Sequence, residues 1–171
     1  MRMTKVELLN ALKERMEADT ENMLFPVRPQ KAGEDSVLKH ADVYCQRLPD
    51  TTQPTKKAPY IINSIVNSKH AQSPGDDAAI SVTVVRTTFC VYCDDEQEGS
   101  LMLLNLMECI RISLLKNPIL RKQFLCLLDD TNGGGIEDLV YPDNLHPYYI
   151  GEMITVWDMP RVKREVPCLW Q

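Results

Sequence analysis

The sequence lacks any long hydrophobic run: no apolar stretch in its 171 residues approaches the roughly 18 that a membrane-spanning helix needs. The N-terminal stretch MRMTKVELLNALKER interrupts its leucines with charges, unlike the apolar centre of a secretory signal peptide. Histidine is scarce, with three residues, and none of them lies within a known family signature. These absences predict a protein made in the cytoplasm, with no membrane contact and little material for histidine-dependent catalysis.

The composition is that of an ordinary globular domain, with 44% apolar and 25% charged residues. We expect one domain over residues 1–171, with a basic C-terminal tail at 160–171. The 19 basic and 24 acidic side chains give a formal net charge of -5, so the surface as a whole is a poor footprint for nucleic acid. The six cysteines are spread through apolar segments, which predicts reduced, mostly buried thiols.

Two helices are predicted. Thr4-Lys5-Val6-Glu7 has the spacing of a capping box, and apolar residues at four-residue steps follow it, which predicts an amphipathic helix over residues 5–18. A second helix of about sixteen residues is expected to be capped by Ser100 and to stop at Asn117-Pro118.

The second helix is apolar nearly all round, with only a narrow polar stripe near Asn105, Glu108 and Arg111. Such a helix must be covered on more than one side. It is either sandwiched between a sheet and another element of its own subunit, or part of it meets a neighbouring copy.

Strand patterns occupy much of the remaining chain, with turn or loop composition at 49–59, 73–77 and 129–144. The apolar residues of the longest strand change parity at Val84-Val85, which predicts a bulge there. Because strands and helices do not alternate regularly, we expect an α+β fold, a mostly antiparallel sheet with the N-terminal amphipathic helix and the central apolar helix packed on it. The predicted extended segments are Met23–Val27, a half-exposed strand around Val43 and Cys45, Tyr60–Val66 and Ala79–Tyr92 as a hairpin, Gln123–Leu128, and Tyr148–Trp157.

Motifs for chemistry are incomplete. Cys90 and Cys93 have the spacing of one arm of a zinc site, but no second pair exists, and residues three apart in a strand point to opposite faces. Buried, unliganded cysteines are therefore favoured over metal or redox chemistry. The triple glycine at 133–135 lacks the spacing of a phosphate-binding loop. We expect no catalytic residue, no cofactor and no metal.

Two charged clusters remain as candidate contact sites. The acidic run at 94–98 lacks the alternating ligands of a calcium loop and suits a solvated connection that favours a helix N-terminus. The basic run near residue 161 could meet phosphate or an acidic protein face, or it could be solvated surface. Together with the polar stripe of the central helix, the candidate partner or subunit contacts are Arg161, Lys163, Arg164, Asp94, Asp95, Glu96, Asn105, Glu108 and Arg111.

Five short stretches occur in a suggestive order: PYII at 59–62, FCVY at 89–92, LLKNP at 114–118, YYIGE at 148–152 and MPRVKREVP at 159–167. Over about residues 4–167 the chain resembles the tail terminator, or tail completion, proteins of long-tailed bacteriophages and prophages of Gram-positive bacteria. The resemblance implies a small α+β subunit that forms a homohexameric ring, caps the finished tail tube and stops its growth.

The resemblance also implies the partners of this non-enzymatic virion assembly protein. They are other copies of the chain, the tail tube protein, and the head connector or stopper protein, while DNA passes through the ring without specific binding. The protein would be made in the host cytoplasm and act in head–tail joining at the tail–neck junction. Two alternatives stay open: another neck protein, such as a head-closure or connector-adaptor protein, and a small thiol-dependent enzyme.

Overall fold

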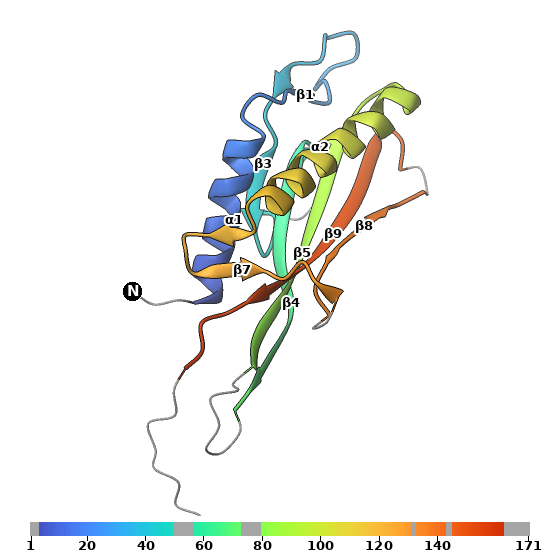
Figure 1. Ribbon diagram of the computed structural model, residues 1–171. Coiled ribbons are helices and arrows are strands. Elements are labelled where there is room, and N and C mark those ends of the chain that lie inside the picture. Colours follow the sequence, from blue (N-terminus) through green and yellow to red (C-terminus); the bar gives the residue numbers. More distant parts are fainter. Residues whose placement is uncertain (1–3, 50–56, 73–79, 131–132, 143–144, 163–171) are drawn as a thin grey trace, which may run out of the picture.

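Figure 1 shows the computed structural model of the protein, which describes residues 4–49, 57–72, 80–130, 133–142 and 145–162. The helices of this part of the chain are α1 (Lys5–Asp19) and α2 (Glu96–Lys116). Its strands are β1 (Phe25–Pro26), β2 (Leu38–Lys39), β3 (Asp42–Cys45), β4 (Tyr60–Ala71), β5 (Ile80–Tyr92), β6 (Ile119–Leu120), β7 (Phe124–Cys126), β8 (Ile136–Val140) and β9 (Tyr148–Asp158).

The main sheet has the order β3-β4-β5-β9-β7-β6, and β8 pairs with β9 on the same side as β7. Only β3 and β4 run parallel among the described pairs, and the other pairings are antiparallel. β1 and β2 form a separate two-stranded ribbon. This arrangement confirms the predicted α+β class with a mostly antiparallel sheet.

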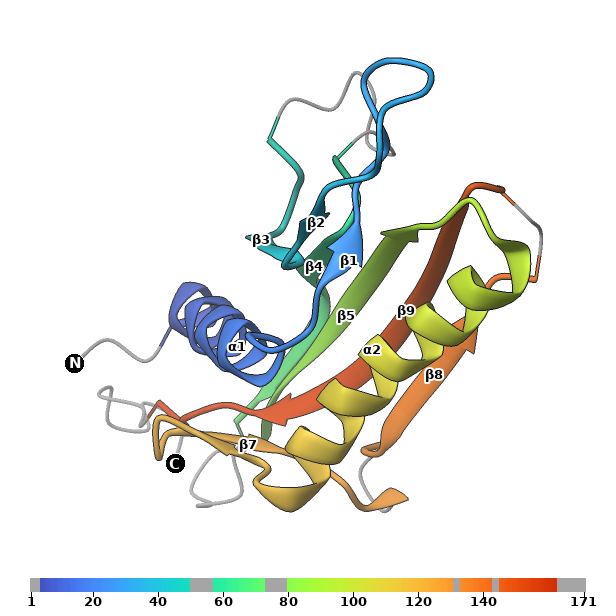
Figure 2. The ribbon, with the colours of Figure 1, turned by 90° about the horizontal axis from the view of Figure 1, so that it is seen from above.

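Both helices lie on one face of the sheet (Figure 2), where α1 contacts β3 and β4 while α2 contacts β5 and β9. The main core fills the space between them with alternate residues of the strands, such as Phe89 of β5 and Trp157 of β9, both fully buried. In the part of the chain that the structure describes, the opposite face carries no helix and has a smaller apolar cluster near one end. That cluster consists of Leu48, Ala58, Tyr60, Cys90, Tyr92 and Tyr148.

Helix α1 starts with the predicted capping box. The backbone N–H of Glu7 donates to the Thr4 hydroxyl at 3.3 Å, and the backbone N–H of Thr4 donates to the Glu7 carboxylate at 2.9 Å. The apolar stripe, including Leu8 and Leu12, is buried against the sheet. The prediction of a helix over residues 5–18 is therefore confirmed to within one residue.

Helix α2 begins earlier than predicted. The Asp95 carboxylate accepts two backbone N–H groups of the first turn, both at 2.9 Å, so Asp95 and not Ser100 is the N-cap. Ser100 lies inside the helix, where its hydroxyl donates to the Glu96 carbonyl at 3.2 Å. The helix has 21 residues and ends at the predicted stop, with Asn117 as its C-cap.

Strands β4 and β5 form the predicted antiparallel hairpin, whose proposed turn at 73–77 lies outside the described residues. The predicted switch of buried face in β5 is wrong, because Ser81 and Thr83 are buried on the same side as Val85. A one-residue irregularity does occur at this level of the hairpin. It lies in β4, between Ile65 and Asn67, so the predicted bulge at Val84-Val85 is on the wrong strand.

The C-terminal third departs furthest from the sequence prediction. β7 is shorter than the predicted 123–128, and the stretch before it forms β6 and a tight turn in which Arg121 and Lys122 have left-handed φ values of 47° and 56°. The predicted loop at 129–144 contains strand β8, which pairs with β9. The sequence alone missed this edge strand.

Candidate assembly interface

The outward face of α2 carries four exposed apolar side chains. Leu101, Leu104, Ile112 and Leu115 have exposed fractions of 55%, 47%, 37% and 44%. With 3.6 residues per turn, these positions fall on one side of the helix, around Glu108. We call these four residues the α2 stripe. The buried residues of the same helix, such as Leu106 and Ile110, face the sheet.

The predicted polar stripe is therefore not a separate face. Asn105 and Glu108 are exposed between the apolar residues of the α2 stripe, and Arg111 lies on its flank. The Arg111 Nε donates to the Glu108 carboxylate at 2.7 Å, which lowers the pKa of Glu108. This exposed pair leaves the apolar character of the surface intact.

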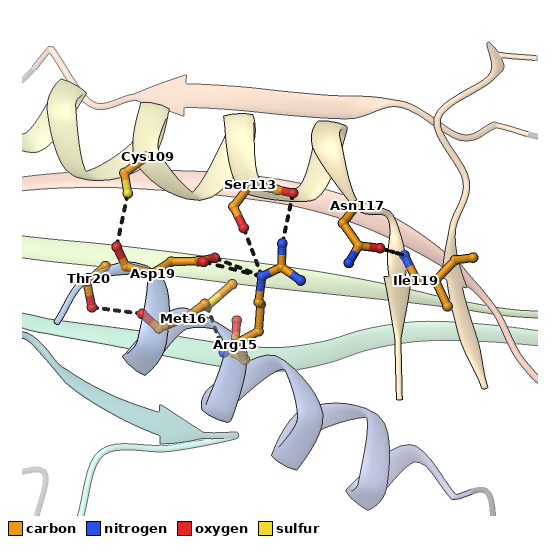
Figure 3. A network of polar contacts seen from close by, with 9 residues as sticks. Arg15, Met16, Asp19, Thr20, Cys109, Ser113, Asn117 and Ile119 are labelled. Carbon is orange, nitrogen blue, oxygen red and sulfur yellow. Dashed lines mark hydrogen bonds and ion pairs between the residues drawn. The ribbon is translucent and has the colours of Figure 1, made fainter. Parts of the chain in front are cut away.

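A polar network fixes how α2 is rotated over the sheet (Figure 3). Arg15 of α1 donates from Nε to the Ser113 hydroxyl at 2.9 Å and from Nη2 to the Ser113 carbonyl at 3.1 Å, while Asp19 holds its guanidinium at 3.2 Å. One turn away, the Cys109 thiol lies 3.3 Å from the Asp19 carbonyl. Because α1 is hydrogen-bonded to this side of α2, the α2 stripe faces away from α1 and the sheet.

The acidic connection before α2 is used within the chain. Asp95 caps the helix, and Asp94 accepts a hydrogen bond from the Tyr92 hydroxyl at 2.6 Å. Burial is the largest cause that raises the pKa of Tyr92 to about 12. Glu96 is exposed in the first turn of α2, where its charge favours the helix dipole. Two of these three predicted contact residues therefore have structural partners.

The basic run is described only at its start. Arg161 is exposed and lines a cleft beside the β4–β5 hairpin with His70 and Ile80, and Val162 is 76% exposed. Lys163 and Arg164, the other two predicted contact residues, lie outside the described residues. The structure does not bring Arg161 near the acidic run, which lies at the opposite end of β5.

Strand β8 forms an edge of the sheet beside α2 (Figure 2). Its side chains Leu139 and Val140 are 54% and 39% exposed, and Tyr141 follows at 43%. Asp138 faces Arg111 of α2, and desolvation is the largest cause of its raised pKa, which Arg111 partly offsets. The α2 stripe and the β8 edge are therefore neighbouring surfaces, and Arg111 lies between them.

The sequence could have located the α2 stripe but not the β8 edge. Positions 101, 104, 112 and 115 share a helix face in any helical projection. The strand status of β8 depends on its pairing with β9, which no local pattern in IEDLV reveals.

Four of the described thiols lie in environments that are unfavourable for nucleophilic catalysis. Burial raises the pKa of Cys90 to about 11 and that of Cys126 to about 12, and it also raises the pKa values of Cys45 and Cys109. A reactive cysteine requires the opposite shift. Among the described residues, no group of three or more Cys, His, Asp or Glu side chains has the arrangement of a metal site.

The contact between His70 and Ser81 follows from strand register. His70 Nδ1 lies 2.9 Å from the Ser81 hydroxyl because these residues are direct partners in the β4–β5 pairing. The strand pairing accounts for this contact, and a catalytic role is not needed to explain it.

None of the described helices is both long and apolar enough to cross a membrane. No family model matches the chain, and no curated protein matches its sequence.

Proposed function

We propose that this protein is a non-enzymatic virion assembly subunit of the tail terminator kind. It forms a ring on the finished tail tube of a long-tailed phage, ends tube growth and joins the tail to the head. Its partners are other copies of the chain, in a hexamer, the tail tube protein, and the head connector or stopper protein. DNA passes through the ring without specific binding, at the tail–neck junction of the virion.

The α2 stripe is the observation that carries this proposal. Four large apolar side chains side by side on an exposed helix face are typical of a surface that another protein covers. Apolar centres with a charged surround are typical of lasting subunit contacts, and Glu108 and Arg111 supply such charges here. The Arg15 network keeps this face directed outward, as a permanent contact requires.

The thiol environments support assembly over the alternative of a thiol-dependent enzyme. The raised pKa values of Cys90 and Cys126 leave few thiolates at these two positions at neutral pH, and the thiolate is the nucleophile. The formal net charge of -5 also suits a ring through which DNA must move without being held.

Light scattering of the purified chain, alone and with its tail tube subunit over a range of concentrations, tests the proposal. The wild type is expected to form hexamers in at least one of the two conditions. Leu104→Glu combined with Leu115→Glu should reduce the mass, because two charges then enter the subunit contact. Val6→Glu is the matched control, since Val6 is an apolar residue of α1 that is 65% exposed. Substitutions at such exposed positions change folding stability by only about 0.5 kcal/mol.

A monomer in both conditions, with no binding to the tube subunit, would refute the proposal. Binding to the head connector without binding to the tube subunit would favour a head-closure or connector-adaptor role instead.

A further inference from the structure

Within the described residues, the outer side of β8 has no strand partner for its backbone groups. The N–H of Tyr141 donates to the carbonyl of Ile150 at 3.2 Å, in continuation of the antiparallel β8–β9 register. Bonded and non-bonded residues alternate along an antiparallel strand. Ile136, Asp138 and Val140 therefore direct their N–H and C=O groups away from β9. No strand pairs with this side of β8 within the part of the chain that the structure describes.

The side chains around this edge combine acidic and apolar groups. Asp138 and Val140 share the helix side of the sheet, because their partners in β9 are Met153 and Gly151 on that side. Glu137 and Leu139 point to the helix-free side and are exposed. A strand added here would meet two carboxylates and two partly exposed apolar side chains. Its best partner is an extended segment with basic and apolar residues.

The segment after β9 has this composition. It reads RVKREV from Arg161, with three basic residues among its first four positions and a valine at the second and sixth. Pro160 precedes it and cannot donate to a strand ladder, so the chain is free to leave its own sheet there. The start of the segment is accessible, since Arg161 and Val162 are exposed.

The segment leaves β9 on the side away from β8. The side-chain amide of Gln72, which follows β4, donates to the carbonyl of Val162. β4 and β5 lie on one side of β9, and β8 lies on the other side. The start of the segment is therefore held beside the hairpin of its own copy, and the β8 edge faces a different neighbour.

We propose that the C-terminal segment beginning at Arg161 adds as a strand to the β8 edge of a neighbouring copy. This inference rests on the proposed self-assembly and names the contact that links one copy to the next. Backbone hydrogen bonds to Ile136, Asp138 and Val140 supply the affinity, and the basic side chains meet the carboxylates of Glu137 and Asp138. Pairing of two β8 edges is disfavoured, because it would bring these carboxylates together with their counterparts in the second copy.

The contact is heterologous, because each copy gives a segment to one neighbour and receives a segment from another. Contacts of this type close into rings when the rotation between copies permits it. The arrangement is therefore compatible with a hexamer without requiring one.

Two full-length variants separate the halves of this contact. Val140→Pro removes the outward amide of the edge and leaves the hydrogen bonds between β8 and β9 in place. Its matched control is Val140→Thr, which keeps the amide and the β-branched shape. Lys163→Glu with Arg164→Glu reverses the charge of the segment and leaves the edge intact. Glu137→Lys, which changes the charge of the edge without touching its backbone, is a second edge variant in case the proline variant fails to fold.

Sedimentation velocity under reducing conditions, with circular dichroism to verify folding, gives the readout. Val140→Pro and the Lys163→Glu, Arg164→Glu variant each lack one half of the contact. Each of them alone should associate at least about tenfold more weakly than the wild type, whereas Val140→Thr should match the wild type. An equimolar mixture of Val140→Pro with the Lys163→Glu, Arg164→Glu variant should form a one-to-one heterodimer. In that mixture one copy retains a working segment and the other retains a working edge.

The outcomes for this contact and for the proposed function are distinct. Blocked variants that still assemble like the wild type, or a mixture that forms no heterodimer, would overturn the segment exchange and leave ring formation through the α2 stripe standing. A heterodimer from the mixture, with a wild-type chain that neither forms a hexamer nor binds the tube subunit, would support the exchange and refute the terminator role.

Discussion

Gly99 of α2 lies directly against the ring of Tyr149 in β9, and replacing it with alanine should destabilise the protein. A Cβ atom at this position would lie 2.1 Å from Cε2 of Tyr149 and 2.6 Å from two further ring atoms. The ring has little room to move. Tyr149 is 6% exposed, its hydroxyl donates to the Asp95 carbonyl at 3.4 Å, and His146 contacts its edge at a centroid distance of 6.4 Å.

Two opposing effects set the size of the change. Alanine is a better helix former than glycine by about 1 kcal/mol in an open helix. Overpacking of a tight site costs about 1–3 kcal/mol, and the 2.1 Å approach places Gly99 near the upper end of that range. The net expectation is a loss of about 2 kcal/mol, which corresponds to a decrease in Tm of roughly 4–8 °C for a chain of this length.

Urea unfolding followed by circular dichroism measures the free energy of unfolding of Gly99→Ala and of the wild type. The same substitution should become neutral or stabilising in a Tyr149→Val background, because the smaller side chain removes the clash and leaves only the gain in helix propensity. An increase in stability of Gly99→Ala in the wild-type background would refute the close packing of α2 on β9.

Three further changes test local parts of the structure. Thr4→Ala should lower the free energy of unfolding by about 1 kcal/mol, measured in urea, because it removes the N-cap of α1. The raised pKa of Asp138 means that its charge opposes folding above that pKa and that this cost disappears as the pH falls. Asp138→Asn should therefore stabilise the protein relative to the wild type more at pH 7 than at pH 3, in parallel urea titrations. Cys90 and Cys126 should resist iodoacetamide at pH 8 until urea unfolds the chain, and rapid labelling of either in the native protein would contradict their burial.

Local signals in the sequence located the ends of helices where one residue dominates. The capping box at Thr4 and the stop at Asn117-Pro118 both act within a few residues, so both predictions are confirmed. The start of α2 was misplaced because Asp95 and Ser100 are both good caps. The choice of Asp95 adds a turn that also packs Gly99 against Tyr149, which is a tertiary contact.

Buried polar residues caused the error in β5. Ser81, Thr83 and Thr87 occupy core positions, so the apolar pattern suggested a change of face that does not occur. Thr87 satisfies its hydroxyl by donating to the Asn63 side chain at 2.7 Å. Such cross-strand pairs depend on a partner strand, and composition alone cannot reveal them.

The candidate contact residues also differ in whether their role was evident from the sequence or only from the tertiary structure. Charge composition singled out Asp94 and Asp95, but their carboxylates turned out to serve the local structure. The apolar character of α2 was evident from its sequence, whereas the exposure of one side became evident only once α1 and the sheet were placed. A helix that is apolar all round has no unique orientation until its neighbours fix one.

The α2 stripe and the β8 edge lie on adjoining flanks of the subunit, which bears on how many neighbours are needed to cover them. Arg111 connects the two, because it pairs with Glu108 within the stripe and faces Asp138 on the edge. A neighbour whose C-terminal segment adds to β8 would therefore bring its body against the flank of α2. Arg111 would then lie inside the contact with its ion-pair partner Glu108, and the basic side chains of the incoming segment would face Asp138, so that no charge is buried unpaired. One heterologous contact is thus enough to cover both exposed surfaces, as a ring of identical subunits requires.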